Sequence, residues 1–203
     1  FPTRRSSDLI QAVLIAIFYY LSWSPWLTYV GFFTWNRPLL AGFVTGIILG
    51  DPVQGAIIGA GINMIYLGFI SAGGAQMGDP AFAGYVGTAL AIASKLDVST
   101  AMAIAVPLGT VATVLWIGKM TVNSFFAHWA DREVQKGNVD RVAFINIVPP
   151  QILLFAMSFI PALLVVYFGP NAIDGMLEVM NDNVLHVFNV IGAMLPALGI
   201  AMN

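Results

Sequence analysis

The sequence predicts an all-α, polytopic transmembrane protein in which several helices are broken or re-entrant. Of its 203 residues, 59% are hydrophobic and 9% are charged, whereas an average globular chain has about 25% charged residues. Uncharged runs long enough to cross a bilayer recur along the chain. Between residues 37 and 80, glycines at short intervals interrupt an apolar background. Membrane helices use such glycines to pack closely against one another.

The composition also excludes several classes of function. A net charge of −2 without a basic arm argues against a nucleic-acid partner. The chain has no cysteine and only two histidines, so we expect no disulfide, no thiol chemistry and no dedicated metal site. It also lacks a nucleotide-binding loop, a catalytic carboxylate pair and a Ser/His/Asp arrangement. We therefore predict no catalytic residue and no cofactor.

Residues 1–9 differ from the rest of the chain. They carry three charges, lack an initiating methionine and resemble a translated adapter remnant. A twin-arginine signal at Arg4-Arg5 is the alternative, although no small-residue cleavage site follows. We therefore treat residues 1–9 as a non-native remnant and residues 10–203 as one membrane-embedded domain. The chain stops inside an apolar segment, which predicts a C-terminal truncation.

Residues 10–36 contain no charge and are long enough for one spanning helix. The stretch Ser22-Trp-Ser-Pro-Trp26 breaks this run near its middle, and Pro25 predicts a kink. Its tryptophans, together with Trp35, are typical of interfacial anchors or of helix packing. Stacking against a sugar is the alternative for these rings.

The next apolar segments are too short for ordinary spans. Residues 38–50 and 81–94 provide about 13 and 14 residues, when roughly 20 are needed to cross. They predict re-entrant hairpins or half-helices. Residues 53–72 between them are long enough to cross and carry Asn63 at the centre. This asparagine is either a helix–helix hydrogen-bonding group or a ligand contact.

Two features of this region point to packing and to a substrate path. Glycines 42, 46 and 50 are four residues apart and lie near one helical face, so we expect them to pack against protein rather than lipid. Asp51 and Asp79 interrupt the apolar background, and each precedes a proline. Polar, irregular backbone at membrane depth usually lines a cavity.

Residues 98–118 predict a full span with a kink at Pro107. Residues 121–141 are polar and predict the one water-facing helix and loop. The chain's densest basic group outside the N-terminus surrounds this loop, which places it in the cytoplasm by the positive-inside rule: Lys119, Arg132, Lys136 and Arg141. His128 is either a phosphoryl acceptor or a solvated interfacial histidine, and no glycine-rich cradle accompanies it.

Residues 142–173 are uncharged and predict a crossing bent by prolines. Asp174, Glu178 and Asp182 follow at intervals of four, which predicts one acidic helical face. This face is either solvated on the extracytoplasmic side or a cation site. Residues 184–202 begin another membrane segment.

An ordered set of motifs in this chain resembles a known family. These motifs are Arg37-Pro38-Leu39, Gly46-Ile-Ile-Leu-Gly50-Asp51, Gly55 and Gly59, Leu67-Gly68, Gly78-Asp79-Pro80 and Gly192-Ala-Met-Leu-Pro196-Ala-Leu-Gly199. Together with the basic loop, they resemble the enzyme IIC subunit of the mannose/fructose/sorbose family of bacterial sugar phosphotransferase systems. One departure is Asn63, where family members commonly carry a glutamate. This difference bears on the identity of the sugar.

The resemblance implies a multi-pass permease of the bacterial inner membrane that binds a hexose or hexosamine near the bilayer midplane. The sugar would belong to the mannose, fructose, sorbose or N-acetylgalactosamine class. The implied partners are a membrane subunit, enzyme IID, and the cytoplasmic carriers IIA and IIB, with the permease in an oligomer. Two other classes stay open: an ion-coupled secondary transporter that uses Asp51 or Asp79, and a membrane scaffold.

We predict that Asp79, Gln76 and Asn63 form hydrogen bonds with the sugar, with Asp79 as the principal contact. Carboxylate and amide groups match hydroxyls that both donate and accept. Nearby glycines, at 73, 74 and 78, would let backbone groups approach a ligand closely. Alternatively, Asp79 caps the helix that begins at Pro80. The two roles are compatible.

Overall fold

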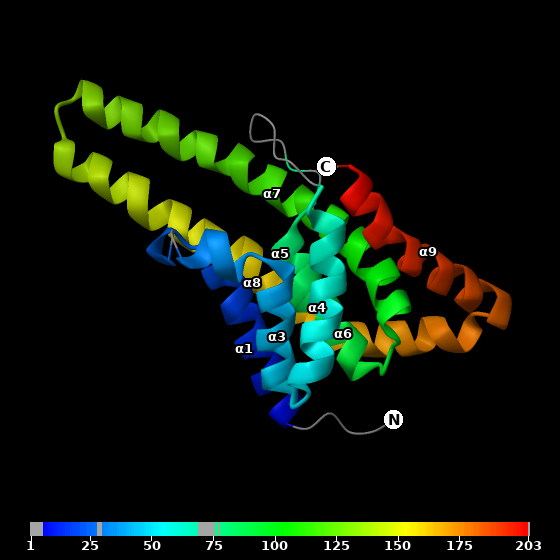
Figure 1. Cartoon of the computed structure of the whole chain (residues 1–203). Helices are drawn as coiled ribbons and strands as arrows, with labels where there is room; N and C mark the ends of the chain where they lie inside the picture. Colours follow the sequence, from blue (N-terminus) through cyan, green and yellow to red (C-terminus); the bar gives the residue numbers. More distant parts are fainter. Residues whose placement is uncertain (1–5, 28–29, 69–75, 77, 203) are drawn as a thin grey trace.

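The computed structural model describes residues 6–27, 30–68, 76 and 78–202, and within these residues the fold is helical, without strands (Figure 1). The predicted all-α class is therefore confirmed. The helices are α1 (Ser6–Trp23), α3 (Pro38–Leu49), α4 (Pro52–Tyr66), α5 (Pro80–Phe82), α6 (Thr88–Ala93), α7 (Val98–Gln135), α8 (Val139–Val179) and α9 (Asp182–Ala201). A 3₁₀ turn at Pro25–Leu27 and π-helical turns at Gly31–Trp35 and Ala83–Gly87 complete the described elements.

The first apolar run does not form one kinked spanning helix, so that part of the prediction is wrong. Helix α1 ends at Trp23, inside the predicted break Ser22–Trp26, so the position of the break is confirmed. Two of the tryptophans are half-buried and pack on other aromatic rings, as the helix-packing alternative predicts. Trp35 stacks on Phe18 with ring centroids 5.1 Å apart, and Trp23 lies 5.0 Å from Trp116. Trp26 is 73% exposed, as an interfacial anchor would be.

Helices α3 and α4 form a tight antiparallel hairpin through their glycines. A Cβ atom built on Gly42 would lie 2.5 Å from the Gly55 carbonyl oxygen and 2.7 Å from Gly59 Cα. Gly46 likewise abuts backbone atoms of residues 51–55. Glycine therefore permits backbone-to-backbone contact here, and the prediction that Gly42 and Gly46 pack against protein is confirmed.

Gly50, the third glycine of the predicted four-residue spacing, has another role. The prediction that it packs against protein is therefore wrong. Gly50 ends α3 in the left-handed conformation with φ +88°, and a Cβ there would meet nothing within 4 Å. Glycine adopts this conformation at little cost. Asp51 then caps α4, since its side chain accepts a hydrogen bond from the Gln54 N–H at 3.0 Å.

Three segments are shorter than a spanning helix. The predicted half-helices are confirmed as α3 and as the continuous apolar helix Pro80–Ala93. The segment 53–72 was expected to be long enough to cross. However, α4 ends at Tyr66 after 15 residues, which is fewer than the roughly 20 that a crossing requires. Residues 69–72 of that segment lie outside the described part of the chain.

In the part of the chain that the structure describes, three helices are long and apolar enough to cross a membrane, namely α7, α8 and α9. Helices α7 and α8 form a long hairpin that projects from the other helices (Figure 1). They contain 38 and 41 residues, or about 57 and 62 Å at 1.5 Å per residue. The predicted helix and loop of residues 121–141 correspond to the end of α7, a short turn and the start of α8. The prolines inside α8 do not interrupt it.

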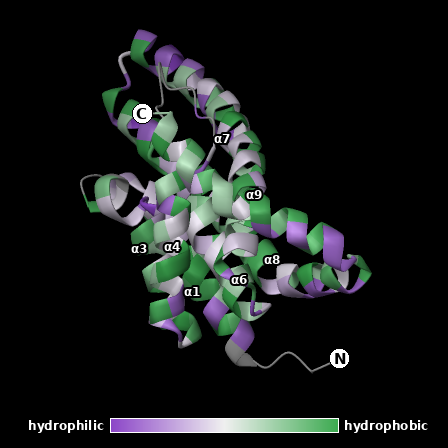
Figure 2. Ribbon diagram, turned by 45° about the vertical axis from the view of Figure 1, so that its right-hand side comes forward, coloured by the Kyte–Doolittle hydropathy of each residue, from purple (hydrophilic) through white to green (hydrophobic). Residues whose placement is uncertain are grey.

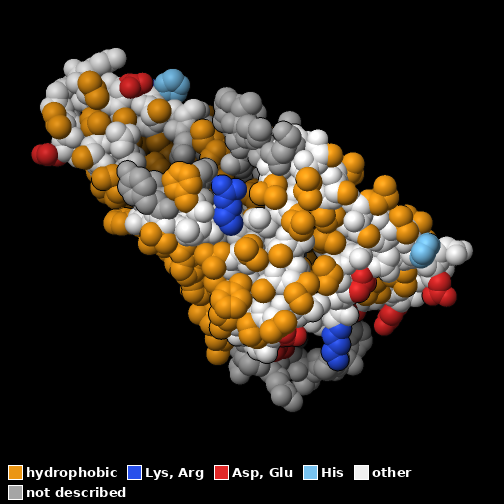
Figure 3. All heavy atoms as spheres, viewed as in Figure 1, with side chains coloured by type: hydrophobic (Ala, Val, Ile, Leu, Met, Phe, Trp, Pro, Cys, Tyr) orange, Lys and Arg blue, Asp and Glu red, His pale blue; other side chains and the backbone are white. Residues whose placement is uncertain are grey.

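Polar residues gather near the α7–α8 and α8–α9 turns, with hydrophobic residues between them (Figure 2). Hydrophobic side chains cover much of the face shown in Figure 3, and charged groups on it are few, as lipid contact requires.

The prediction that Asp174, Glu178 and Asp182 lie on one helical face is wrong. Helix α8 ends at Val179, and Asp182 opens α9 instead.

Candidate functional site

A cavity of about 490 Å³, widely open to the surface, lies at the end of the α3–α4 hairpin away from its turn. Its lining combines three polar and three apolar side chains: Thr34, Arg37, Leu39, Leu40, Asn63 and Leu67. This volume falls within the range of about 300–1,000 Å³ that is typical of small-molecule sites. Amide, guanidinium and hydroxyl groups set in leucine walls can hold a ligand that carries several hydroxyls.

The ends of two helices place these polar groups. Arg37 is the extended residue before α3, which starts at Pro38, where a proline is favourable because the first N–H has no helical partner. The Arg37 side chain makes no capping hydrogen bond. Asn63 is half-buried on α4 beside the fully buried Ile62. The Thr34 hydroxyl donates to the Val30 carbonyl, so its oxygen remains an acceptor for a ligand.

Asp79 lies elsewhere, in the protein interior, where it is 3% exposed. One carboxylate oxygen accepts from the Phe82 N–H at 2.9 Å, and the other accepts from the Tyr19 hydroxyl at 2.6 Å. The Asp79 N–H donates to the Gly109 carbonyl oxygen at 2.8 Å. The capping role of Asp79 is therefore confirmed, and the same side chain connects α1 to the start of α5.

A second, much smaller hollow surrounds Asp79. Side chains of α1, α7 and α8 line it together with the carboxylate: Tyr19, Trp23, Leu115, Trp116, Lys119, Met157 and Ser158. Its free space of about 10 Å³ suffices for about one water molecule. A hexose does not fit there in this conformation.

Lys119 is the charged residue that the structure adds to the predicted Asp79 in this hollow. Its ammonium nitrogen lies 3.9 Å from the Trp116 ring centroid and 5.2 Å from that of Trp23, which are cation–π distances. The prediction had placed Lys119 with the basic residues of the polar loop. A tryptophan three residues earlier, on the same helical face, was the local signal for the observed packing.

The three predicted site residues are not brought into one cavity. Asn63 lines the large cavity and Asp79 the small one. The Gln76 side-chain oxygen is buried and has no hydrogen-bond partner among the described residues. Of the predicted glycines, 73 and 74 lie outside the described residues, while a Cβ on Gly78 would lie 3.0 Å from the Tyr66 ring.

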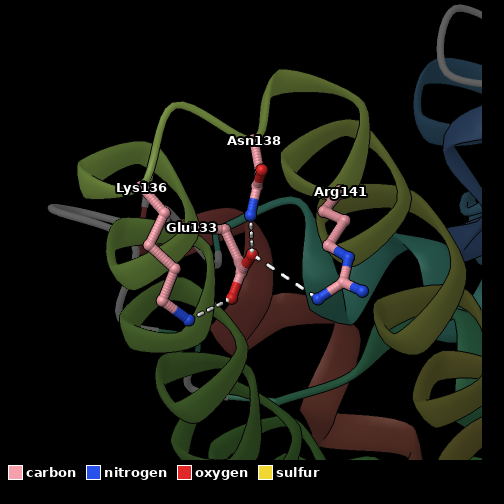
Figure 4. Close-up of polar contacts among 4 residues, drawn as sticks. All are labelled: Glu133, Lys136, Asn138 and Arg141. Carbon is pink, nitrogen blue, oxygen red and sulfur yellow. Dashed lines mark hydrogen bonds and ion pairs between the residues drawn. The ribbon is translucent and has the colours of Figure 1, made fainter.

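The turn between α7 and α8 is organised by one buried carboxylate (Figure 4). Glu133 is 3% exposed. It accepts hydrogen bonds from Lys136 Nζ at 2.7 Å and from Asn138 Nδ2 at 2.8 Å, and an Arg141 guanidinium nitrogen lies 3.8 Å away. These contacts close the turn, while the Lys136 and Arg141 side chains remain largely exposed.

A polar cluster joins α7 to α9 at the other end of α7. The Asp97 carboxylate accepts from the Ser99 and Thr100 N–H groups and from the Thr100 hydroxyl. With its amide nitrogen turned toward Asp97, Asn189 of α9 donates to the same carboxylate at 2.6 Å. Within the described part of the chain, no group of three histidine or acidic side chains is placed to hold a metal ion.

Comparisons with known proteins agree over most of the chain. Residues 9–203 match the family model of the PTS system sorbose-specific IIC component. The chain is 31% identical over 199 residues to the PTS system sorbose-specific EIIC component of Lacticaseibacillus casei, which covers 95% of this chain and 69% of that protein. It is 34% identical over 172 residues to the PTS system mannose-specific EIIC component of Escherichia coli K12, covering 84% and 64%. The aligned region thus spans about two thirds of these relatives' lengths.

A solved structure has the same fold. It is the mannose transporter ManYZ in complex with microcin E492, of which one chain superposes with a TM-score of 0.70 at 31% sequence identity. The superposition covers 98% of this chain and 78% of that one.

Proposed function

Because the chain belongs to the sorbose-specific IIC component family of the PTS system, we propose that it is a sugar permease subunit of a phosphoenolpyruvate-dependent phosphotransferase system. It is a multi-pass protein of the bacterial membrane. In this proposal, it binds a hexose or hexosamine and presents the sugar for phosphorylation by cytoplasmic partner subunits. The observation that carries the proposal is the cavity of about 490 Å³ at Asn63.

The chemistry of this cavity supports a sugar ligand. The Asn63 amide both donates and accepts hydrogen bonds, and the Thr34 oxygen accepts them. Leu39 and Leu67 provide apolar walls for the C–H faces of a sugar ring. Sugar-binding contacts of this type require no charge on the ligand.

Gln76 and Asp79 belong to the proposed site as well, in a different position from Asn63. The buried Gln76 oxygen has an unused acceptor among the described residues. Two of the roughly four lone-pair positions of the Asp79 carboxylate accept hydrogen bonds already. Since the hollow beside it holds about one water, a sugar can touch Asp79 only after α7 or α8 moves away from α1.

We propose the mannose, fructose, sorbose or N-acetylgalactosamine class as substrates, enzyme IID as the membrane partner, and IIA and IIB as the cytoplasmic carriers of an oligomeric complex. The names of the relatives support the substrate classes, and the ManYZ transporter supports a membrane partner. The α7–α8 turn is proposed to face the cytoplasm. Its exposed Arg132, Lys136 and Arg141 support that orientation, whereas Lys119 packs inside the protein and does not contribute.

The first test is the energy source of uptake. Cells that produce the chain with IID, IIA and IIB subunits should accumulate phosphorylated sugar only when phosphoenolpyruvate is available. Uptake of unmodified sugar driven by an ion gradient, without the carriers, would instead support an ion-coupled secondary transporter. If no sugar binds under either condition, the result would support a membrane scaffold instead of a transporter.

The second test concerns the site residues. Asn63→Ala should lower sugar affinity, and Asn63→Glu should alter sugar preference if Asn63 contacts the sugar. Asn183→Ala, on the exposed first turn of α9, is the matched control. Asp79→Asn retains a capping side chain but loses the charge, and Asp79→Ala loses both. If Asp79→Asn retains full uptake while Asp79→Ala only lowers the amount of folded protein, Asp79 is a cap and not a sugar contact.

A further inference from the structure

One of the described residues that line the large cavity is charged, namely Arg37, and a neutral sugar does not require this charge. Among the described residues, no carboxylate forms an ion pair with Arg37, and its side chain is exposed and makes no capping bond. Of the residues that the structure describes, no acidic one lines the cavity. The positive charge of Arg37 is therefore available to a ligand that also contacts Asn63 in this cavity.

We propose that Arg37 makes this cavity a binding site for a phosphate monoester, the phosphorylated form of the transported sugar. A guanidinium matches phosphate oxygens with two parallel N–H donors, and such charge-assisted hydrogen bonds are roughly twice as strong as neutral ones. Asn63 and Thr34 would hold the sugar hydroxyls while Arg37 holds the phosphate. This inference rests on the proposed function, which supplies phosphoryl transfer to the sugar.

The position of the cavity agrees with a role after phosphorylation. The turn between α3 and α4 lies toward the bottom in Figure 1, whereas the other end of these two helices and the α7–α8 turn lie toward the top. Arg37 begins α3 and Leu67 follows α4, so the cavity belongs to the upper end. This is the end proposed to face the cytoplasm, where the phosphoryl carriers work.

The experiment measures binding to the full chain in nanodiscs of zwitterionic lipid. Mannose, fructose, sorbose and N-acetylgalactosamine are tested first, then the phosphate monoester of each sugar that binds, and inorganic phosphate alone. The monoester should bind about tenfold more tightly than its neutral sugar, and Arg37→Gln should bring the ratio of the two affinities to about one. Arg37→Lys should restore part of it, because an ammonium supplies charge without the two-donor geometry.

Lys95→Gln, at an exposed turn outside both hollows, is the matched control and should leave the preference unchanged. Equal affinity for a sugar and its monoester, or a preference that survives Arg37→Gln, overturns the inference while the proposed function stands. If no sugar binds in any form, the proposed function itself fails. Loss of the preference in nanodiscs that contain anionic lipid would assign Arg37 to a lipid headgroup and would also overturn the inference.

Discussion

Replacing Gly42 with alanine should destabilise the protein although alanine favours helices. The new Cβ would lie 2.5 Å from the Gly55 carbonyl oxygen, whereas ordinary contact begins at 3.4 Å. Helices α3 and α4 would therefore have to separate by about 0.9 Å there. The Gly55 carbonyl oxygen and the Gly59 Cα atom, which a Cβ on Gly42 would meet, both belong to the backbone. No side-chain rotation can therefore relieve the contact. Overpacking of this kind costs about 1–3 kcal/mol.

The matched control is Gly175→Ala on α8, where a new Cβ meets nothing within 4 Å. That variant should gain about 0.5–1 kcal/mol from helix propensity. Both variants share this gain, so the difference between them isolates the packing cost of about 1–3 kcal/mol. For a chain of this size, each kcal/mol shifts Tm by about 2–4 °C.

Thermal unfolding of both variants in the same detergent, followed by tryptophan fluorescence, gives the measurement. Gly42→Ala should melt several degrees below Gly175→Ala. Gly46→Leu, with a larger side chain at the same interface, should melt lower still or fail to assemble. If all three variants melt within a degree of the original protein, the close approach of α3 and α4 does not limit stability, and the reasoning is refuted.

Three further predictions concern other parts of the molecule. Tyr19→Phe keeps the ring but removes the hydroxyl that donates to Asp79, and should cost about 1–3 kcal/mol in thermal unfolding; an unchanged Tm would show that this hydrogen bond contributes nothing. Asp97→Ala removes the α7 cap and the contact with Asn189, and should cost about 0.5–2 kcal/mol, whereas Asp97→Asn should retain most of the cap. The chain has no cysteine, so Gln135→Cys provides a single thiol near the α7–α8 turn. A membrane-impermeant reagent should modify it in opened cells but not in intact cells, and labelling of intact cells would reverse the proposed orientation.

The sequence predicted local features of the α3–α4 hairpin well because they depend on short-range physics. Glycine spacing located the packing face at Gly42 and Gly46, and run length identified α3 as a half-helix. The role of Gly50 was missed although a signal was present. A glycine followed by Asp51-Pro52 combines a helix end with a new N-cap, and this local signal outweighs the four-residue spacing.

The candidate site was less predictable because it depends on contacts between distant segments. Asn63 and Asp79 interrupt the same apolar region, which suggested one cavity. In the fold, Asn63 lies at the end of α4, whereas Tyr19 of α1 holds Asp79 in the interior. Lys119 lies forty residues after Asp79, and no local pattern indicates that they line one hollow. Helix periodicity gives the face of a residue but not the element that covers it.

The length of the α7–α8 hairpin has a mechanical consequence. Each arm is about twice as long as the roughly 30 Å hydrocarbon core is thick. Exposed apolar side chains continue along the arms, including Phe125 and Phe144, so lipid or protein must cover them well beyond the central helices. A rigid arm of this length is a lever. The arm of α7 from Trp116, which lines the Asp79 hollow, to Glu133 at the turn is about 26 Å long at 1.5 Å per residue. A rotation of about 10° at Trp116 would carry the turn through about 4–5 Å, so small rearrangements around the Asp79 hollow would be amplified at the distant end.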